Sequence, residues 1–230
     1  MEAGTDDLRN AVINDGFWTI EDETIGKTLD ELVNSGFHIQ TVPGMELCNA
    51  AVFGNKLVKD TTRSFFRQST LGFYRKFGKT KNTHCVLPRT RELRILLIFV
   101  WSSRSRMRFY PQTHLQNLGA VPAGNGLFML PNLAEESPVI RGLAPTEVTM
   151  DHGGLAILDA RTWWKIEAGT FVMFGIMTPE ESEHWLKMPL PVTLSDAVSQ
   201  MTDENMSMNV RFFDPNSIST ATDSALHAGK

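Results

Sequence analysis

The run Ile95–Trp101, seven consecutive apolar residues, constrains the fold of this chain more than any other segment. It is far shorter than the roughly 20 apolar residues that a helix needs to span a bilayer. Its branched and aromatic side chains are typical of a short strand that is covered on both faces. We therefore expect this run to lie in the interior of a β-rich domain.

Several other short segments have the composition of strands, and turn residues separate them. A Gly, Pro and Asn-rich turn at residues 119–126 follows the first of them. The segments span residues 105–111, 127–131, 145–154, 155–160 and 170–177. Many short strands with turns between them are typical of a sandwich or a barrel. We expect that architecture from about residue 83 onward.

Helices are expected on both sides of the β-rich region. In residues 22–39, four apolar residues recur at helical spacing and Gly36 stands where a helix would end; the four are Ile25, Leu29, Leu32 and Val33. The aromatic residues of 55–78 predict that helix continues there, with Gly78 as its end. After the strands, Thr178, Pro179 and Glu181 form a capping box that predicts a helix start. Residues 194–201 predict another short helix.

Length and composition favour one soluble domain. A chain of 230 residues with 42% apolar residues can bury a sizeable core. We expect the domain to cover residues 1–200, and residues 201–230 to form a partly mobile C-terminal extension in which 210–213 can dock. The acidic N-terminal residues argue against a signal peptide, and Cys48 and Cys85 form no disulfide framework, so we expect a cytoplasmic protein.

The net charge of −4 conceals an uneven distribution of charge. Residues 61–110 hold 12 of the 22 Lys and Arg residues and a single acidic residue, Glu92. Such a block can attract an anionic substrate or an acidic protein surface, or it can pair with the acidic remainder of the same chain. No nucleic-acid motif accompanies the charge, so we expect no nucleic-acid partner.

Catalytic motifs are missing from the sequence. It contains no Walker A loop, no Gly-x-Gly-x-x-Gly loop and no Gly-x-Ser-x-Gly elbow. None of the six histidines opens a His-x-Asp, His-x-His or His-Glu-x-x-His pattern; they are His38, His84, His114, His152, His184 and His227. Asp151-His152 is the best local candidate for a pair of metal ligands, although the two glycines that follow also suit a turn.

The order of these segments nevertheless resembles a known enzyme family. The chain resembles phytanoyl-CoA dioxygenase-like Fe(II)/2-oxoglutarate oxygenases, in particular fungal members that modify meroterpenoids. The resemblance lies in the order of helices, then Ile95–Trp101, residues 105–114 and residues 153–164. The resemblance covers about residues 29–177 and includes Pro111–His114, which is similar to a turn common in that family. It implies a mainly β fold with flanking helices, namely a double-stranded β-helix (a cupin-like jelly roll).

The same resemblance implies an iron site that has lost its ligands. The family holds iron with a His-x-Asp pair and a distal histidine. At the matching positions this chain has His84, Val86 and Trp164. A valine has no ligating atom, and an indole has no lone pair to donate. The arginine that grips 2-oxoglutarate is also missing from residues 170–177. We therefore expect no cofactor in this chain.

Three functions remain open. The first is a non-catalytic subunit that supports an active, homologous oxygenase in secondary-metabolite biosynthesis; that partner would bind Fe(II), 2-oxoglutarate and most of the substrate. The second is an active Fe(II)/2-oxoglutarate dioxygenase acting on a small hydrophobic metabolite, with His84, Asp151 and His152 as ligands. The third is a metal-free cupin-like isomerase or small-molecule binding protein, in which Arg106, Arg108 and His114 point into the barrel.

A hetero-oligomer would need an interface, and aromatic residues are enriched at the centre of interfaces. The candidates are Phe65, Phe66, Phe73, Tyr74, Trp163 and Trp185. The sequence leaves open whether each of them is an interface residue or an ordinary core residue.

Overall fold

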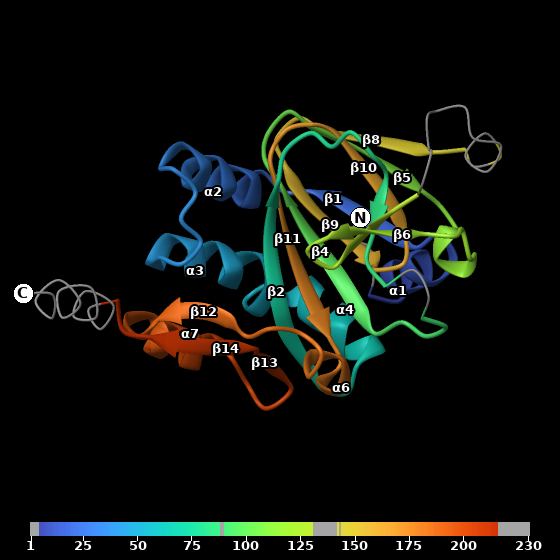
Figure 1. Ribbon diagram of the computed structural model, residues 1–230. Coiled ribbons are helices and arrows are strands. Elements are labelled where there is room, and N and C mark those ends of the chain that lie inside the picture. The colour runs from blue at the N-terminus through green and yellow to red at the C-terminus, as the bar shows by residue number, and fades with distance from the viewer. Residues whose placement is uncertain (1–4, 88–89, 131–141, 143, 216–230) are drawn as a thin grey trace, which may run out of the picture.

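A computed structural model describes residues 5–87, 90–130, 142 and 144–215 of the chain. Two six-stranded sheets lie face to face, and helices cover the outer side of one of them (Figure 1). We call the sheet with strand order β1-β9-β4-β11-β2-β13 the major sheet, and the sheet with order β6-β7-β3-β10-β5-β8 the minor sheet. This is the jelly roll that the family resemblance implies.

The strands of the major sheet are β1 (Phe17–Glu21), β2 (Ser69–Phe77), β4 (Ile95–Trp101), β9 (Gly154–Asp159), β11 (Phe171–Met177) and β13 (Met206–Met208). The strands of the minor sheet are β3 (His84–Cys85), β5 (Ser105–Tyr110), β6 (Val121–Gly124), β7 (Leu127–Met129), β8 (Thr146–Met150) and β10 (Trp163–Ala168). Two further strands, β12 (Met188–Pro191) and β14 (Val210–Phe213), pair in parallel with each other.

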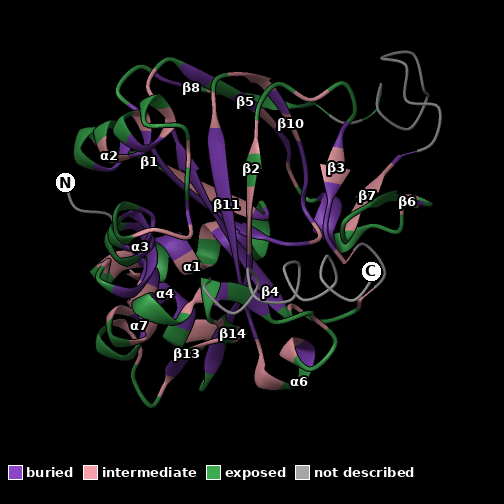
Figure 2. Ribbon diagram, turned by 60° about the vertical axis from the view of Figure 1, so that its left-hand side comes forward, coloured by how far each residue is buried: buried purple, intermediate pink, exposed green. Residues whose placement is uncertain are grey.

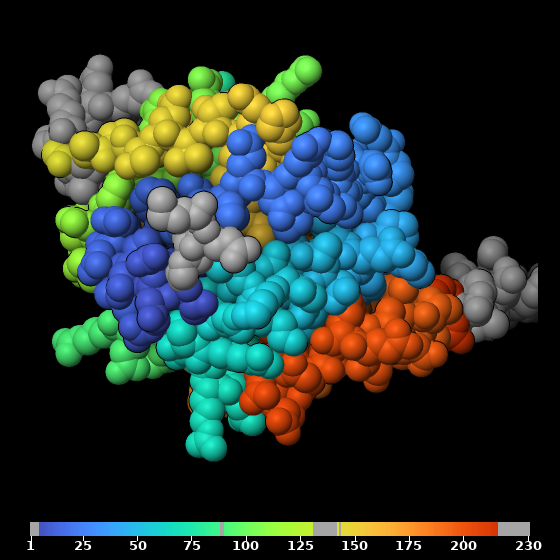
Figure 3. Space-filling view, turned by 180° about the vertical axis from the view of Figure 1, so that it is seen from behind, coloured from blue at the N-terminus to red at the C-terminus, as the bar shows by residue number. Residues whose placement is uncertain are grey.

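The helices are α1 (Thr5–Asn14), α2 (Glu23–Asn34), α3 (Val42–Cys48), the π-helical turn η1 (Asn49–Phe53), α4 (Lys56–Phe65), the 3-10 turns η2 (Thr113–Leu115) and η3 (Val192–Leu194), α6 (Pro179–Ser182) and α7 (Ser195–Met201). Seen from behind, α1 to α4 form one continuous cover that meets the C-terminal segment (Figure 3). None of the helices in the described part of the chain is long and apolar enough to cross a membrane.

Strand β4 shows why its sequence is apolar throughout. Every residue of β4 is buried, because the strand lies in the middle of the major sheet (Figure 2). Leu96, Ile98 and Val100 pack against the helices, whereas Leu97 and Phe99 face the minor sheet. The two faces of one strand thus belong to two hydrophobic cores, as the prediction from Ile95–Trp101 requires.

One predicted helix start is confirmed, and a second helix proves to be capped in the same way. The Asp22 carboxylate accepts a hydrogen bond from the Ile25 backbone N–H (3.1 Å) and caps α2. The Thr178 hydroxyl accepts from the Glu181 N–H (3.3 Å) and caps α6, with Pro179 in its first turn. These local signals need no tertiary contact, which is why the sequence reveals them.

The helix predicted over residues 55–78 is correct only in its first half. Helix α4 ends at Phe65, and residues 69–77 form β2 in the major sheet. The aromatic side chains that suggested one helical face include Phe73 and Phe77. Both lie on the inner face of β2, because every second residue of a strand points to the same face. Pairing of β2 with β11 along its length overrides the helical pattern.

The C-terminal residues complete the barrel. Strand β13 pairs in parallel with Ser69–Leu71 of β2 and covers the first part of that edge of the major sheet. Asn209 then connects three segments: its N–H donates to the Leu71 carbonyl (2.9 Å), its side-chain amide to the Trp185 carbonyl (3.3 Å), and its own carbonyl accepts from the Met188 N–H (2.8 Å). The extension predicted to begin at residue 201 therefore starts as part of the fold. The mobility predicted for its end concerns residues 216–230, outside the described part.

Candidate functional site

Strands β3 and β10 bring together the positions that the family resemblance assigns to iron ligands. His84 and Trp164 are direct cross-strand partners in the minor sheet. Val86 is two residues beyond His84 and belongs to the core between the two sheets, as Trp164 does. Residues that the sequence separates by about 80 positions thus form one cluster, which we call the His84–Trp164 cluster: His84, Val86 and Trp164.

Trp164 joins the two sheets at this point. Its side chain is 0% exposed, and its ring lies 5.0 Å from that of Phe99 and 5.4 Å from that of Phe77 on the major sheet. The ring of His84 is 5.5 Å away on the neighbouring strand. Edge-to-face contacts of this kind add to the free energy of apolar burial. The indole therefore occupies the space between the sheets as a packing residue.

Two nitrogen atoms of the cluster have no hydrogen-bond partner in the described part of the chain. They are Nδ1 of His84 and Nε1 of Trp164, and both are buried. Burial also lowers the pKa of His84, so the imidazole is neutral near pH 7. A neutral imidazole can donate or accept, whereas an indole N–H only donates.

These residues do not fit an iron ion. Only His84 offers a ligating atom, because Val86 and Trp164 have none, and the bulk of Trp164 fills the neighbouring space. In residues 5–87, 90–130, 142 and 144–215, no group of three or more His, Cys, Asp or Glu residues is arranged to hold a metal.

The alternative ligands Asp151 and His152 lie far from His84. They follow β8, whose last residue, Met150, pairs with Ser105, while Trp164 pairs with Phe109 at the other end of β5. Ser105 and Phe109 are four residues apart on β5, so the two pairing positions are separated by about 13 Å along the strand at roughly 3.3 Å per residue. Asp151 and His152 are exposed in the turn between β8 and β9. The structure thus does not assemble the predicted set.

The expectation that Arg106 and Arg108 point into the barrel is wrong. On β5 the residues alternate, and Met107 and Phe109 take the inner face. The two arginines therefore lie on the outer face of the minor sheet. There an ion-pair network, which we call the outer-face network, joins Arg106 and Arg108 to Glu147 (3.6 and 3.2 Å), Arg108 to Glu167 (3.3 Å) and Lys165 to Glu167 (3.6 Å).

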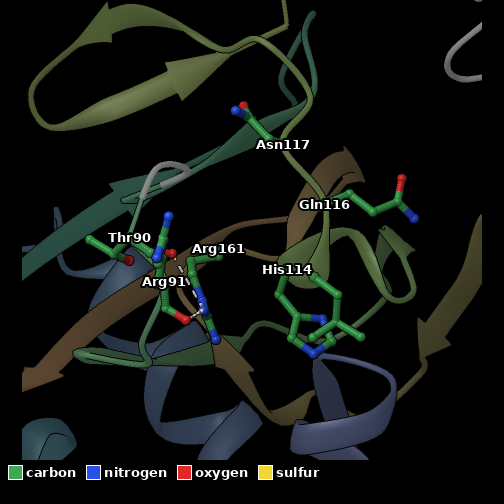
Figure 4. A pocket seen from close by; sticks show the side chains of 7 residues that line it. Thr90, Arg91, His114, Gln116, Asn117 and Arg161 are labelled. Atoms are coloured by element: carbon green, nitrogen blue, oxygen red, sulfur yellow. Dashed lines mark hydrogen bonds between the residues drawn. The ribbon is translucent and has the colours of Figure 1, made fainter.

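His114 also lies outside the barrel. Gln112 adopts a left-handed backbone conformation (φ 61°), and the turn carries His114 toward α1, where its Nε2 lies 2.9 Å from the Ile13 carbonyl oxygen. The ring borders a surface pocket of about 450 Å³ together with Arg91 and Arg161 (Figure 4). Arg161 is not free to bind a ligand there, because its guanidinium is bonded to the buried carboxylate of Asp159 and to the Arg91 carbonyl (2.8 Å).

The six predicted interface aromatics divide into two groups. Phe66, Phe73 and Trp163 are buried within this chain, so most of each side chain packs in its own core and not against a partner. Phe65, Tyr74 and Trp185 are partly exposed. The interface prediction is therefore corrected for the first group, whereas the second group remains a set of candidate interface residues.

Arg75 is a residue that the sequence interpretation missed. It pairs with Met173 of β11, whose side chain faces the interior, so Arg75 also lies on the inner face of β2. Its guanidinium stacks on the Phe73 ring at 5.3 Å, and burial lowers its pKa. It makes no ion pair with a described residue. Recognising Phe73-x-Arg75-x-Phe77 as a strand would have revealed it.

Comparison with known proteins supports the fold. No protein-family model matches the chain, and no curated protein sequence is significantly similar to it. Solved structures do match. The Fe³⁺ and α-ketoglutarate complex of the epimerase SnoN has a TM-score of 0.55 at 14% identity, over 76% of this chain and 83% of that chain.

Two further structures match at similar levels. Iron-bound HygX from Streptomyces hygroscopicus has a TM-score of 0.53 at 12% identity, over 77% of this chain and 88% of its own. EctD from S. alaskensis, solved with 2-oxoglutarate and 5-hydroxyectoine, has a TM-score of 0.52 at 10% identity, over 75% of each chain. This chain therefore has the jelly-roll fold of iron- and 2-oxoglutarate-dependent oxygenases and epimerases.

Proposed function

We propose that this chain is a non-catalytic subunit, which pairs with a homologous, active Fe(II)/2-oxoglutarate oxygenase and supports it. The observation that carries the proposal is Trp164. It stands opposite His84, where the resemblance implies a metal ligand, and it is packed against Phe77 and Phe99. An iron site would need this indole replaced and a carboxylate introduced at Val86.

A biosynthetic role for the pair has indirect support. SnoN is described as an epimerase of nogalamycin biosynthesis. An inactive jelly roll can stabilise an active one only through a surface, and three partly exposed aromatics supply candidates: Phe65, Tyr74 and Trp185. Arg9 lies over the Phe65 ring at 5.3 Å, so that candidate combines an aromatic surface with a positive charge.

Restoring the missing ligands tests the assignment of the metal position. We expect the purified wild-type chain to bind no stoichiometric Fe(II) in an anaerobic titration. The variant Val86→Asp/Trp164→His, which adds a carboxylate and an imidazole beside His84, should gain measurable affinity. The matched control is Val86→Asp/Lys165→His, because Lys165 is the outward-facing neighbour on β10.

Co-expression tests the role of the chain. Substrate oxidation should appear when this chain is produced together with an oxygenase-like chain that carries His-x-Asp and a distal histidine, and should fall when this chain is omitted. Stoichiometric Fe(II) in the isolated wild type, with turnover of 2-oxoglutarate by this chain alone, would refute the proposal.

A second function, metal-free binding of a small molecule inside the barrel, is favoured by Arg75. Among the described residues this half-buried guanidinium has no carboxylate partner, which leaves its hydrogen bonds open to a ligand. The Trp164 N–H, which also has no partner there, lies beyond Phe77 on the same side. Binding of a small carboxylic acid in the presence of EDTA, lost in Arg75→Gln but kept in Lys76→Gln, would favour this function over the first.

A further inference from the structure

The edge of β2 is only partly covered by its neighbour. Strand β13 pairs with β2 at Ser69–Leu71 and then turns away at Asn209. From Phe73 onward, β2 has no strand beside it on that edge within the described residues. A groove lies between this free edge and the paired strands β12 and β14.

The groove has the size of a ligand site. Its volume is about 670 Å³, and small-molecule sites measure roughly 300 to 1,000 Å³. It is lined by Gln40, Phe73, Tyr74, Leu186, Lys187, Met188, Pro189 and Arg211. These residues come from the α2–α3 connection, from β2 and from the C-terminal strands, so three segments of the fold meet here.

One part of the lining is cationic. Lys187 and Arg211 are exposed, and neither makes an ion pair with a described residue. The lining contains no acidic residue. Arg75 and Lys76, which follow Tyr74 on β2, do not line the groove: Arg75 lies over the Phe73 ring (5.3 Å) and Lys76 lies 4.4 Å from the centre of the Phe37 ring. The local field therefore favours an anion.

The remainder of the lining is apolar. Leu186 is 93% exposed, the highest value among the large hydrophobic residues of the described part. The Phe73 ring stacks on the Trp185 ring at 4.3 Å, and Met188 and Pro189 continue the surface. An apolar surface next to unpaired cations suits a molecule with both characters.

We infer that this groove binds a small amphipathic anion, with its apolar body against Leu186 and Phe73 and its carboxylate beside Lys187 and Arg211. The site lies outside the barrel and does not depend on the proposed subunit role. The cations of the outer-face network differ from those of the groove, because they are already paired with Glu147 and Glu167. The cations of the groove are left for a ligand.

Calorimetric titration of the full chain with three probes tests the inference. Decanoate carries both features, decanol only the apolar body, and acetate only the charge. We expect saturable 1:1 binding of decanoate, at least about fivefold weaker binding of decanol and none of acetate. In Lys187→Gln/Arg211→Gln, decanoate should bind about fivefold to tenfold more weakly, since both charges beside its carboxylate are lost.

Two variants make the result specific. Leu186→Ser should weaken both decanoate and decanol, because the exposed leucine contributes contact area and not charge. Lys27→Gln/Lys56→Gln removes the same charge from α2 and α4 and should change neither affinity. Equal affinity for decanol and decanoate, unchanged binding by Lys187→Gln/Arg211→Gln, or no binding of decanoate would each overturn the inference.

Discussion

The two faces of the minor sheet have opposite characters. On the inner face, Trp164 packs against aromatic rings, and its N–H has no partner in the described part. On the outer face, one residue away, Lys165 belongs to the outer-face network. The face where the resemblance implies chemistry is thus devoted to packing, and the face with the charged residues satisfies its own charges. Charge density in a sequence is therefore a poor guide to a binding site until the pairing of the charges is known.

Replacing the neighbours Trp164 and Lys165 by alanine should give the largest contrast between the faces. Trp164→Ala leaves a cavity between the sheets and should lower the free energy of unfolding by about 3–5 kcal/mol. Lys165→Ala should lower it by less, because Lys165 faces away from the core between the sheets, although its side chain is only 16% exposed and pairs with Glu167. Urea unfolding of the two variants measures the difference, and equal effects would contradict the assignment of the two faces.

Trp164→Phe separates the bulk of the indole from its N–H. A phenyl ring is smaller than an indole, so this change should leave a smaller cavity and cost less than Trp164→Ala. Loss of a buried donor that has no partner in the described part offsets part of that cost. If Trp164→Phe unfolds as easily as Trp164→Ala, the N–H has a partner that stabilises the fold, and the packing role is incomplete.

A buried ion pair offers a second contrast with the outer-face network. Asp159 is 2% exposed, and Arg161 donates to both of its carboxylate oxygens. Removing one member of a buried pair leaves an uncompensated charge, so Asp159→Ala should destabilise the chain by about 3–5 kcal/mol. Asp159→Ala/Arg161→Met should recover part of the loss in the same urea assay; no recovery would indicate that the carboxylate has another role.

The sequence predicted the β-rich region well, because its strands carry their own signals. The apolar run Ile95–Trp101 and the cap at Thr178 specify local structure without distant partners. The direction of Arg106 and Arg108 could not be predicted, since a shift of one residue exchanges the faces of a strand. Arg75 was missed for a related reason: β2 is a strand only because β11 pairs with it.

His84 should make the stability of the folded chain depend on pH, with an effect of intermediate size. Burial lowers its pKa from the ordinary value of 6.5, so the unfolded chain takes up a proton before the folded chain does. His84 should therefore have no pH-dependent effect above about pH 6.5, and stability should fall as the pH drops below that value. In His84→Gln this part of the decline should disappear, as measured by thermal unfolding between pH 5 and 8; an unchanged decline would assign it to other groups.

The smallest effect should come from the centre of the outer-face network. Glu147 pairs with both Arg106 and Arg108 on a partly exposed surface. Glu147→Gln should cost about 0.2–1 kcal/mol at low salt, and screening should reduce the difference in 1 M salt. If Glu147→Gln lowered the free energy of unfolding by more than about 2 kcal/mol, and by the same amount in 1 M salt, solvent would not screen the network.

The uncovered edge of β2 has a consequence for self-association. An open strand edge is a template on which another chain can add a strand, and natural proteins protect such edges with charged residues. Arg75 and Lys76 sit on the stretch that β13 leaves open. A second copy brought up edge to edge would bring the same charges alongside, which should oppose pairing along this stretch. Removing both charges should therefore lower the concentration at which the chain aggregates.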